Sequence, residues 1–400
     1  MNEQEYSTNT GFCPAPWTSV YLNPDGRVDS CCISMNKLGN LVNEKFLDII
    51  ANDKNIKVKQ SMLDGKLPTG CASCDNTSFR TLKNEFVQWF ESAPKELFAS
   101  VDNFKLKYLD LRWRNTCNFA CVYCNSELSS TWAQELGKFP KISKDQHQTL
   151  QKYIVDNIAD LDYVYLAGGE PLLIKENEAI LEQLYVENPN CQIRVNTNLS
   201  VVKNNKIFEL LTKFNKVVWI ISGEGVGDKY EYVRFGGNWN EFDENLQIIR
   251  ELTKSRPPGS IGSVRMSFSK PVYNFHSVTF NSVYCALTIL STFDFIEYIE
   301  QLDFDINTIT LLYYNNGAGG PLDPRNLPKD VVDQSKTLIH KWLAKYPGGG
   351  FAQGLTEILN MLDTPYNNDR FTDVYHTINE LDARRNINSK LTFPELYYDK

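Results

Sequence analysis

The sequence predicts an α/β protein whose sheet is built mainly from parallel strands. Short apolar runs alternate with longer amphipathic stretches between residues 108 and 313, and strands that alternate with helices need crossover connections. The run Val217–Ile221 is apolar at every position, as expected for a strand buried on both faces. A chain of 400 residues is too long for one simple core, so we expect two or three structural units.

The elements are expected in the following order. Six strands are predicted, at 108–113, 163–167, 192–196, 217–221, 263–268 and 308–313. Helices are predicted at 126–137, 144–160, 202–214 and 240–254, with further helical material at 277–302. A break at 315–321, rich in Gly and Asn, precedes three more helices at 328–345, 351–362 and 369–386. These last helices are expected to form a cap, or alternatively to determine substrate specificity.

Composition and charge exclude several classes of function. The net charge of −8 and the pI of about 5.3 argue against a general phosphate-binding surface and give no indication of a nucleic-acid partner. No stretch approaches the ~18 consecutive apolar residues of a membrane-spanning helix. The polar start lacks the basic and apolar regions of a signal peptide. We therefore expect a cytoplasmic protein with no membrane partner.

The chain has ten cysteines but only four histidines, and eight of the cysteines lie in the first 124 residues. In a chain of this size without an export signal, cysteines more often serve metal or redox chemistry than disulfides. The positions form two clusters and two isolated residues. The isolated Cys191 and Cys285 are expected to be buried, inert thiols.

The tighter cluster is Cys117, Cys121 and Cys124, spaced CxxxCxxC. Three thiolates cannot complete a tetrahedral zinc site, and no histidine follows nearby as a fourth ligand. The set suits a [4Fe–4S] cluster in which three irons are ligated and one is open. The alternatives are a zinc knuckle or three incidental core thiols.

Polar and glycine residues follow the predicted strands, where functional loops of parallel α/β folds lie. Strand 163–167 ends in Gly168 and Gly169, which allow the backbone to approach a ligand closely, and then Glu170. A plain strand-to-helix turn is the alternative. The next two strands end at these polar residues: Asn196, Asn198, Ser222 and Glu224.

The CxxxCxxC loop, with Tyr123 before its last cysteine, resembles the signature of the radical S-adenosylmethionine (SAM) superfamily, and Gly168-Gly169-Glu170 matches the GGE motif of that family. The resemblance implies a partial (β/α)6 TIM-like barrel. It also implies a catalytic [4Fe–4S] cluster on the three cysteines, whose open iron binds the amino and carboxylate groups of SAM. Reduction would cleave SAM to a 5′-deoxyadenosyl radical, which abstracts a hydrogen from the substrate.

The same resemblance implies roles for other residues. The GGE motif would contact the SAM amino group, and Tyr123 would shield the cluster. Ser222 and Glu224 would hold the SAM ribose, with Asn196 and Asn198 lining the same site. The stretch 230–236 resembles a "yE.iR.g" segment whose arginine, here Arg234, often reaches the SAM carboxylate; Asn274 resembles a polar position of relatives. Surface or capping roles are the alternatives.

The amino-terminal cysteines predict a second metal site. Cys13 precedes a hairpin with a turn at Asn23–Gly26. The hairpin leads to adjacent Cys31 and Cys32, and Cys71 and Cys74 form a CxxC pair.

This segment resembles the SPASM/twitch type of auxiliary cluster domain, although such domains usually follow the barrel. The resemblance implies one auxiliary [4Fe–4S] cluster. We expect Cys13, Cys31, Cys71 and Cys74 as ligands, with Cys32 as a substitute, because adjacent strand residues point to opposite faces. A structural zinc ribbon is the alternative, since four thiolates also bind zinc.

Three parts are therefore predicted: an auxiliary cluster domain at 1–100, a radical SAM barrel at 101–315 and a helical extension at 316–400. The resemblance implies an enzyme of oxidoreductase, epimerase or lyase type. Its substrate would be a peptide or a small molecule such as a sugar, and its partner an electron donor such as flavodoxin or ferredoxin. A non-enzymatic iron–sulfur or zinc protein, acting as electron carrier or structural module, is the alternative.

Overall fold

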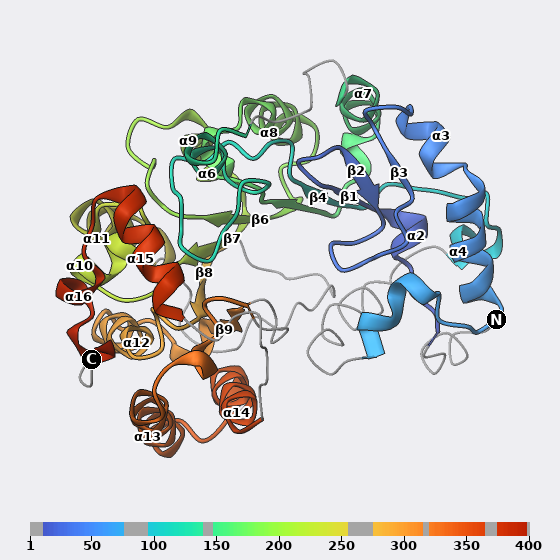
Figure 1. Cartoon of the computed structure of the whole chain (residues 1–400). Helices are drawn as coiled ribbons and strands as arrows, with labels where there is room; N and C mark the ends of the chain where they lie inside the picture. The colour runs from blue at the N-terminus through green and yellow to red at the C-terminus, as the bar shows by residue number, and fades with distance from the viewer. Residues whose placement is uncertain are drawn as a thin grey trace.

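The computed structural model describes residues 11–75, 95–138, 147–254, 275–314, 320–364 and 374–397. They are organised around one nine-stranded sheet with the order β3-β2-β1-β4-β5-β6-β7-β8-β9 (Figure 1). No helix in these ranges is long and apolar enough to cross a membrane.

Six consecutive strands of the sheet are parallel, each paired with the next along the chain. They are β4 (Tyr108–Leu111), β5 (Tyr163–Leu166), β6 (Gln192–Thr197), β7 (Lys216–Ser222), β8 (Phe275–Tyr284) and β9 (Ile309–Tyr313). Helices connect them: α6 (Ser130–Glu135), α7 (Gln148–Asp156), α8 (Lys175–Glu187), α9 (Lys206–Leu211), α10 (Gly227–Val233), α11 (Trp239–Lys254) and α12 (Ser291–Gln301). The predicted α/β partial-barrel fold is confirmed.

The fifth strand differs from the prediction. Helical material was expected at 277–302, but Phe275–Tyr284 is a strand and helix α12 begins only at Ser291. Val278, Phe280 and Tyr284 are buried, whereas Thr279 and Val283 between them are partly exposed. This period of two, together with aromatic and β-branched residues, favours a strand. The strand predicted at 263–268 lies outside the described residues.

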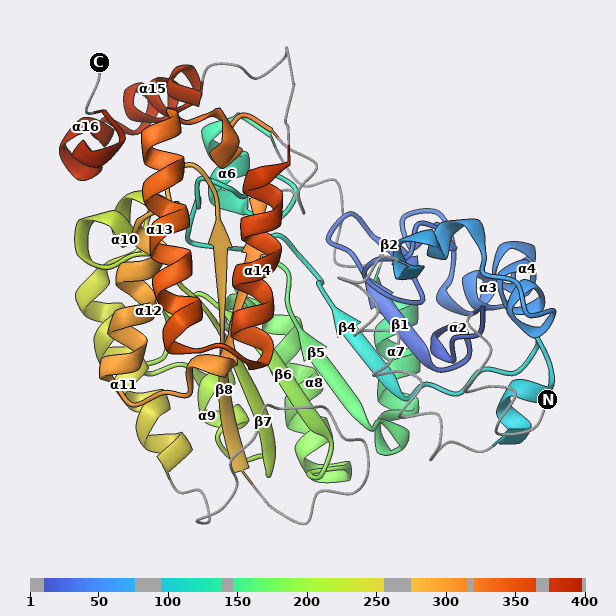
Figure 2. The same ribbon diagram turned by 90° about the horizontal axis from the view of Figure 1, so that it is seen from below.

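The amino-terminal segment extends the same sheet. As predicted, β1 (Ser19–Leu22) and β2 (Arg27–Asp29) form an antiparallel hairpin, whose turn places Gly26 at a φ of 84°. Strand β1 also pairs in parallel with β4, which the sequence did not predict. The segment continues with α2 (Ala15–Thr18), β3 (Gly39–Asn40), α3 (Phe46–Ile50), α4 (Asp53–Leu63) and the 3-10 helix η1 (Thr69–Asp75). In Figure 2 these blue elements lie beyond β4.

The carboxy-terminal helices lie at the other end of the sheet in Figure 2. They are α13 (Lys329–Lys345), α14 (Gly349–Asp363), α15 (Val374–Arg385) and α16 (Ser389–Thr392). Helix α14 packs against β9, whereas α16 packs against α10. The predicted break at 315–321 lies largely outside the described residues. The three-part division at 1–100, 101–315 and 316–400 stays a prediction.

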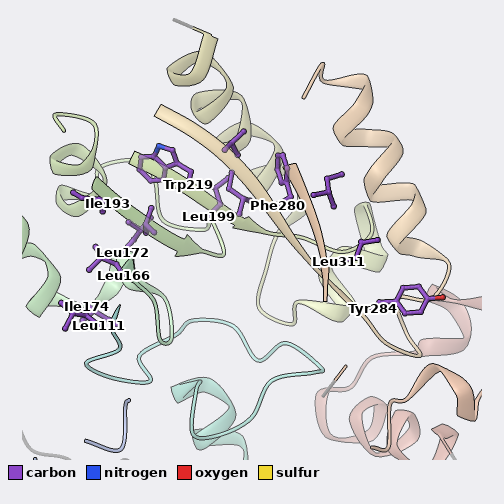
Figure 3. Packing of buried hydrophobic residues seen from close by; sticks show 14 of the residues in the cluster. Leu111, Leu166, Leu172, Ile174, Ile193, Leu199, Trp219, Phe280, Tyr284 and Leu311 are labelled. Atoms are coloured by element: carbon purple, nitrogen blue, oxygen red, sulfur yellow. The ribbon is translucent and has the colours of Figure 1, made fainter. Parts of the chain in front are cut away.

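The two faces of the barrel sheet differ in chemistry. One face is apolar and fully buried, with Leu111, Leu166, Val195 and Trp219 in register across four strands; Figure 3 shows part of this cluster. The residues between these positions face the other way, and many are polar. The helices thus cover the apolar face, and functional side chains are expected on the polar face.

Phe280 tests the strand assignment of residues 275–284. Its buried ring contacts those of Phe295 and Phe304 at centroid distances of 6.0 and 5.1 Å. We expect Phe280→Ala to lower the free energy of unfolding by about 3–5 kcal/mol. Thr279→Ala, on the other face, should cost about 1 kcal/mol or less. Denaturant unfolding measures both; equal losses would contradict the alternation.

Candidate functional site

The loop that carries Cys117, Cys121 and Cys124 follows the carboxyl end of β4 and is held by the residues after it. Thr131 Oγ1 donates a hydrogen bond to the Cys117 carbonyl at 2.8 Å, and Trp132 Nε1 donates to the Cys121 carbonyl at 2.7 Å. Both donors lie in the first turn of α6. Helix α6, which follows the loop in the sequence, therefore holds the loop in place. The three cysteines lie on one short segment.

The glycine motif packs directly against the start of this loop. A Cβ atom on Gly169 would lie 2.1 Å from the carbonyl oxygen of Thr116, so only glycine fits there. Gly168 has a φ of 110°, which also favours glycine, and the Glu170 amide donates to Thr116 O at 2.7 Å. The end of β5 and the cysteine loop thus form one unit.

Glu170 is fully buried and joins the ends of β5 and β6. Its carboxylate accepts hydrogen bonds from Thr197 Oγ1 at 2.8 Å, from the Asn198 amide at 2.7 Å and from the Leu172 amide at 3.1 Å. Burial raises the pKa of Glu170 to about 7, and these hydrogen bonds oppose the rise. A carboxylate offers about four acceptor sites, so one remains for a further donor.

The predicted polar residues fall into two groups at the ends of β6 and β7. The Asn198 side chain lies next to the cysteine loop, with Nδ2 3.9 Å from Cys117 Sγ and 3.1 Å from Asn118 Oδ1. Ser222 Oγ donates to Asn196 Oδ1 at 3.2 Å, so these two side chains are neighbours. Asn274 lies outside the described residues.

Glu224 and Arg234 form a buried ion pair. Arg234 Nε and Nη2 lie 2.8 and 3.3 Å from the Glu224 carboxylate, which also accepts from Tyr123 Oη at 2.9 Å and from the Val283 amide at 3.0 Å. Arg234 Nη1 lies 3.8 Å from Cys121 Sγ. In this structure Arg234 therefore joins Glu224 to the cysteine loop; its predicted contact with the SAM carboxylate, like the predicted ribose contact of Glu224, stays a prediction.

The segment around Arg234 holds the cysteine loop from the side opposite the glycine motif. The amides of Ala120 and Val122 donate to the carbonyls of Phe235 and Val233 at 2.8 and 2.9 Å. Gly236 has a φ of 98°, and a Cβ there would lie 2.7 Å from Asn118 O.

Arg385, at the end of α15, is a site-supporting residue that the sequence analysis missed. Its guanidinium lies 4.6 Å from the ring centroids of both Trp132 and Phe235 and pairs with Glu135 at 2.9 Å. The carboxy-terminal extension therefore packs on the two elements that flank the cysteine loop. No local motif marks this arginine, because its partners are distant in sequence.

The donor set of the loop suits a thiolate-ligated cluster. Burial, followed by the charge of Cys121, raises the pKa of both Cys117 and Cys124 to about 12. Burial also raises the pKa of Cys121, and Arg234 opposes that rise. Binding to a metal deprotonates such thiols. In the described residues no group of three His, Cys, Asp or Glu side chains converges on one metal ion, but thiolates that ligate separate irons need not converge in this way.

The amino-terminal cysteines separate into two environments. Desolvation raises the pKa of Cys31, with smaller contributions from Cys32, Cys13 and Cys71, which are therefore its neighbours. Desolvation raises the pKa of Cys32 to about 11, with Asp110 adding to the rise, Arg112 opposing it and Cys74 contributing least. Cys31 thus lies near two predicted ligands, Cys13 and Cys71, whereas Cys32 is exposed and lies near Cys74 and Asp110.

Cys71 is positioned by the turn after Cys32. Asn36 Nδ2 donates to Cys71 Sγ at 3.3 Å, and the Met35 amide donates to Gly70 O at 2.8 Å. All ten cysteines are in the described ranges and none forms a disulfide there. Cys191 and Cys285 are buried, as predicted, with Cys285 next to Thr288.

Comparisons with known proteins agree with this geometry. The model of the radical SAM superfamily matches residues 113–264, and the model of an iron–sulfur cluster-binding domain, SPASM, matches residues 13–75. Residues 113–264 therefore carry a radical SAM domain, and residues 13–75 before it carry a SPASM-type domain. The first domain implies a [4Fe–4S] cluster and SAM as cofactors, and the second implies an auxiliary iron–sulfur cluster.

Solved structures show similarity at low sequence identity. Native anSMEcpe with bound AdoMet and a Cp18Cys peptide is 15 % identical, with a TM-score of 0.41 over 62 % of each chain. Streptococcus suis SuiB bound to S-adenosylmethionine is 12 % identical, with a TM-score of 0.35 over 60 % of this chain and 44 % of SuiB. The match thus spans less than two thirds of either relative. A search of curated protein sequences finds no match.

The ion pair between Glu224 and Arg234 predicts a strong energetic coupling. Arg234→Gln or Glu224→Gln alone leaves a buried charge without its partner, which should cost about 3–5 kcal/mol of unfolding free energy. The double variant removes both charges and should cost much less than the sum. A double-mutant cycle from denaturant unfolding measures the coupling; additive losses would contradict it.

Glu170 predicts a pH dependence of stability. Its pKa of about 7 in the folded chain exceeds its ordinary value of 4.5, so the folded state binds the proton more tightly. Stability should therefore fall as the pH rises from 4.5 to 7, by about 3 kcal/mol. Glu170→Gln should remove this part of the dependence. Unfolding of both chains across this pH range checks the prediction, and equal slopes would contradict it.

Proposed function

We propose that this protein is a radical SAM enzyme that reductively cleaves SAM and abstracts a hydrogen atom from a substrate. One observation carries the proposal: the loop of Cys117, Cys121 and Cys124 is packed against the glycine motif of β5 on one side and the Arg234 segment on the other. This arrangement places three thiols beside a buried carboxylate with a remaining acceptor site.

The residues of the chain would divide the work as follows. Cys117, Cys121 and Cys124 would hold the cluster, which supplies the electron for SAM cleavage when it is bound. Glu170 would accept a hydrogen bond from the SAM ammonium group. Gly168 and Gly169 have no side chain, so a ligand would be able to approach the backbone closely at the end of β5.

Further polar groups would hold the rest of SAM. Asn196 and Ser222, neighbours at the ends of β6 and β7, would bind hydroxyl groups of the ribose together with Asn198. Tyr123 and Arg234 would keep water from the cysteine loop, because both are tied to Glu224 beside Cys121.

The auxiliary cluster would be ligated by Cys13, Cys31, Cys71 and Cys74. Cys31 is chosen over Cys32 because two of the other ligands, Cys13 and Cys71, are its neighbours, whereas Cys32 has only Cys74. This second cluster would transfer electrons to or from the substrate, or position the substrate. The substrate would be a peptide or a small molecule such as a sugar, the reductant a flavodoxin or ferredoxin, and the location the cytoplasm.

Anaerobic reconstitution of the full chain tests the proposal. We expect about 8 Fe per chain, and formation of 5′-deoxyadenosine from SAM on reduction. Cys117→Ala should abolish this cleavage, whereas Cys191→Ala, which alters a thiol outside both sites, should retain it. Cys31→Ala should remove about 4 Fe, and its matched control Cys32→Ala should keep them.

Two outcomes would overturn these assignments. Bound zinc without SAM cleavage would indicate the rival function, a structural or electron-carrier metal protein. Loss of iron in Cys32→Ala but not in Cys31→Ala would exchange the two adjacent cysteines in the auxiliary site.

A further inference from the structure

A row of polar and aromatic side chains crosses the sheet on the face opposite the apolar core. Tyr21 of β1, Asp110 of β4, Tyr165 of β5 and Arg194 of β6 are register partners on neighbouring strands. Side chains of register partners point to the same face. The interior of a packed parallel barrel is normally filled with Val, Ile and Leu, so this row needs another explanation.

Arg112, two residues after Asp110, turns back to complete this row. Its Nε and Nη2 atoms lie 3.1 and 3.3 Å from the Asp110 carboxylate, and its guanidinium lies 5.0 Å from the ring centroid of Tyr21. The Asp110 side chain is 2 % exposed and that of Arg112 is 21 % exposed. The bonds to Asp110 use two of the five N–H groups of Arg112, and three remain for another acceptor.

Guanidinium groups outnumber carboxylates in and beside the row, although the net charge of the chain is −8. The carboxylates are Asp110 and Asp29, the register partner of Tyr21 on β2, and Asp29 already accepts from Ser34 Oγ and the Lys37 amide. The guanidinium groups are Arg112, Arg194 and Arg27, which lies two residues before Asp29 and so on the same face of β2. Aromatic rings surround the charges: Tyr108 stacks on Tyr163 at 4.7 Å and 6°, and Arg194 lies 5.4 Å from the centroid of Tyr163. Rings beside guanidinium groups form a surface for a planar or aromatic group that carries negative charge.

The row also lies where the amino-terminal domain meets the barrel. The Cys32 thiol interacts electrostatically with Asp110, Arg112 and the tyrosines at 21, 108 and 165. Because β1 pairs with β4, a molecule bound at this row would lie between the amino-terminal segment and the barrel, next to Arg112.

We propose that this row is the substrate-binding face of the protein and that Arg112, supported by Arg194, binds an oxyanion of the substrate, a carboxylate or a phosphate. That the bound molecule is a substrate rests on the proposed function. The oxyanion site itself does not require SAM chemistry. Asp110 orients the guanidinium through two parallel bonds and competes with the incoming anion. Tyr21 and Tyr165 flank it.

Calorimetry on the reconstituted full chain, oxidised and without SAM, tests the site. The probes are N-acetyl-phenylalanine and phenyl phosphate, each compared with an uncharged partner, N-acetyl-phenylalanine amide and phenol. We expect at least one charged probe to bind at least about tenfold more tightly than its neutral partner, because charge-assisted hydrogen bonds contribute roughly this much. Which probe binds distinguishes a carboxylate substrate from a phosphate.

Two variants should shift binding in opposite directions. Arg112→Met should weaken the charged probe about tenfold or more, with Arg112→Lys intermediate because it keeps the charge without the planar fork. Asp110→Asn should tighten binding, since it removes the competing carboxylate. Arg250→Met, which alters an arginine paired with Asp303 elsewhere, is the matched control and should not change binding.

The proposal is overturned if neither charged probe binds better than its neutral partner, or if Arg112→Met and Asp110→Asn both weaken binding equally. Melting temperature and iron content of each variant identify misfolded chains. If Arg112→Met is misfolded, the binding measured for Arg112→Lys tests the proposal in its place. Cleavage of SAM by the unaltered chain is measured separately. A failure of the oxyanion site is thereby distinguished from a failure of the proposed radical function.

Discussion

The carboxylate of Glu224 is the contact on which the position of the cysteine loop depends. It is fully buried, and it accepts hydrogen bonds from Tyr123 in the loop, from Arg234 after α10 and from the amide of Val283 in β8. A buried ion costs several kcal/mol unless its partners satisfy it. These segments must therefore be in place together. A shift of any one would leave the buried charge without a partner, at the cost of its desolvation free energy.

Two glycines, one on each side of the loop, make contacts that allow no side chain at all. Gly169 meets the carbonyl of Thr116, and Gly236 meets that of Asn118. The carboxylate supplies directional bonds, and the glycines supply close approach. The geometry of the three thiols is thus set by residues of the β5–β6 connection, of the β7–β8 connection and of strand β8.

Much of this could be predicted from the sequence, because the informative residues are close together along the chain or sit at strand ends. The cysteine spacing, the glycine motif and the hairpin turn at Gly26 are local signals of this kind. Residues 277–302 misled the analysis because a strand and a helix follow each other there with high apolar content. The burial of alternate residues in β8 becomes visible only when its two neighbours are known.

The partners of long-range contacts could not be predicted. Arg234 was expected to reach a cofactor, and only the folded chain shows Glu224 beside it. Arg385 supports Trp132 across an interval of 253 residues, and no periodicity records such a pairing. The parallel pairing of β1 with β4 could not be predicted either. The turn in the sequence indicates that β1 pairs with β2, but it does not indicate which strand pairs with the other edge of β1.

That pairing of β1 with β4 has a consequence for how the chain assembles during synthesis. Ser19 to Leu22 leaves the ribosome well before Tyr108 to Leu111, its parallel partner. Until then one edge of the hairpin has unpaired amide and carbonyl groups, which favour association with other chains. The amino-terminal segment therefore completes its part of the sheet only after the first strand of the barrel has been synthesised.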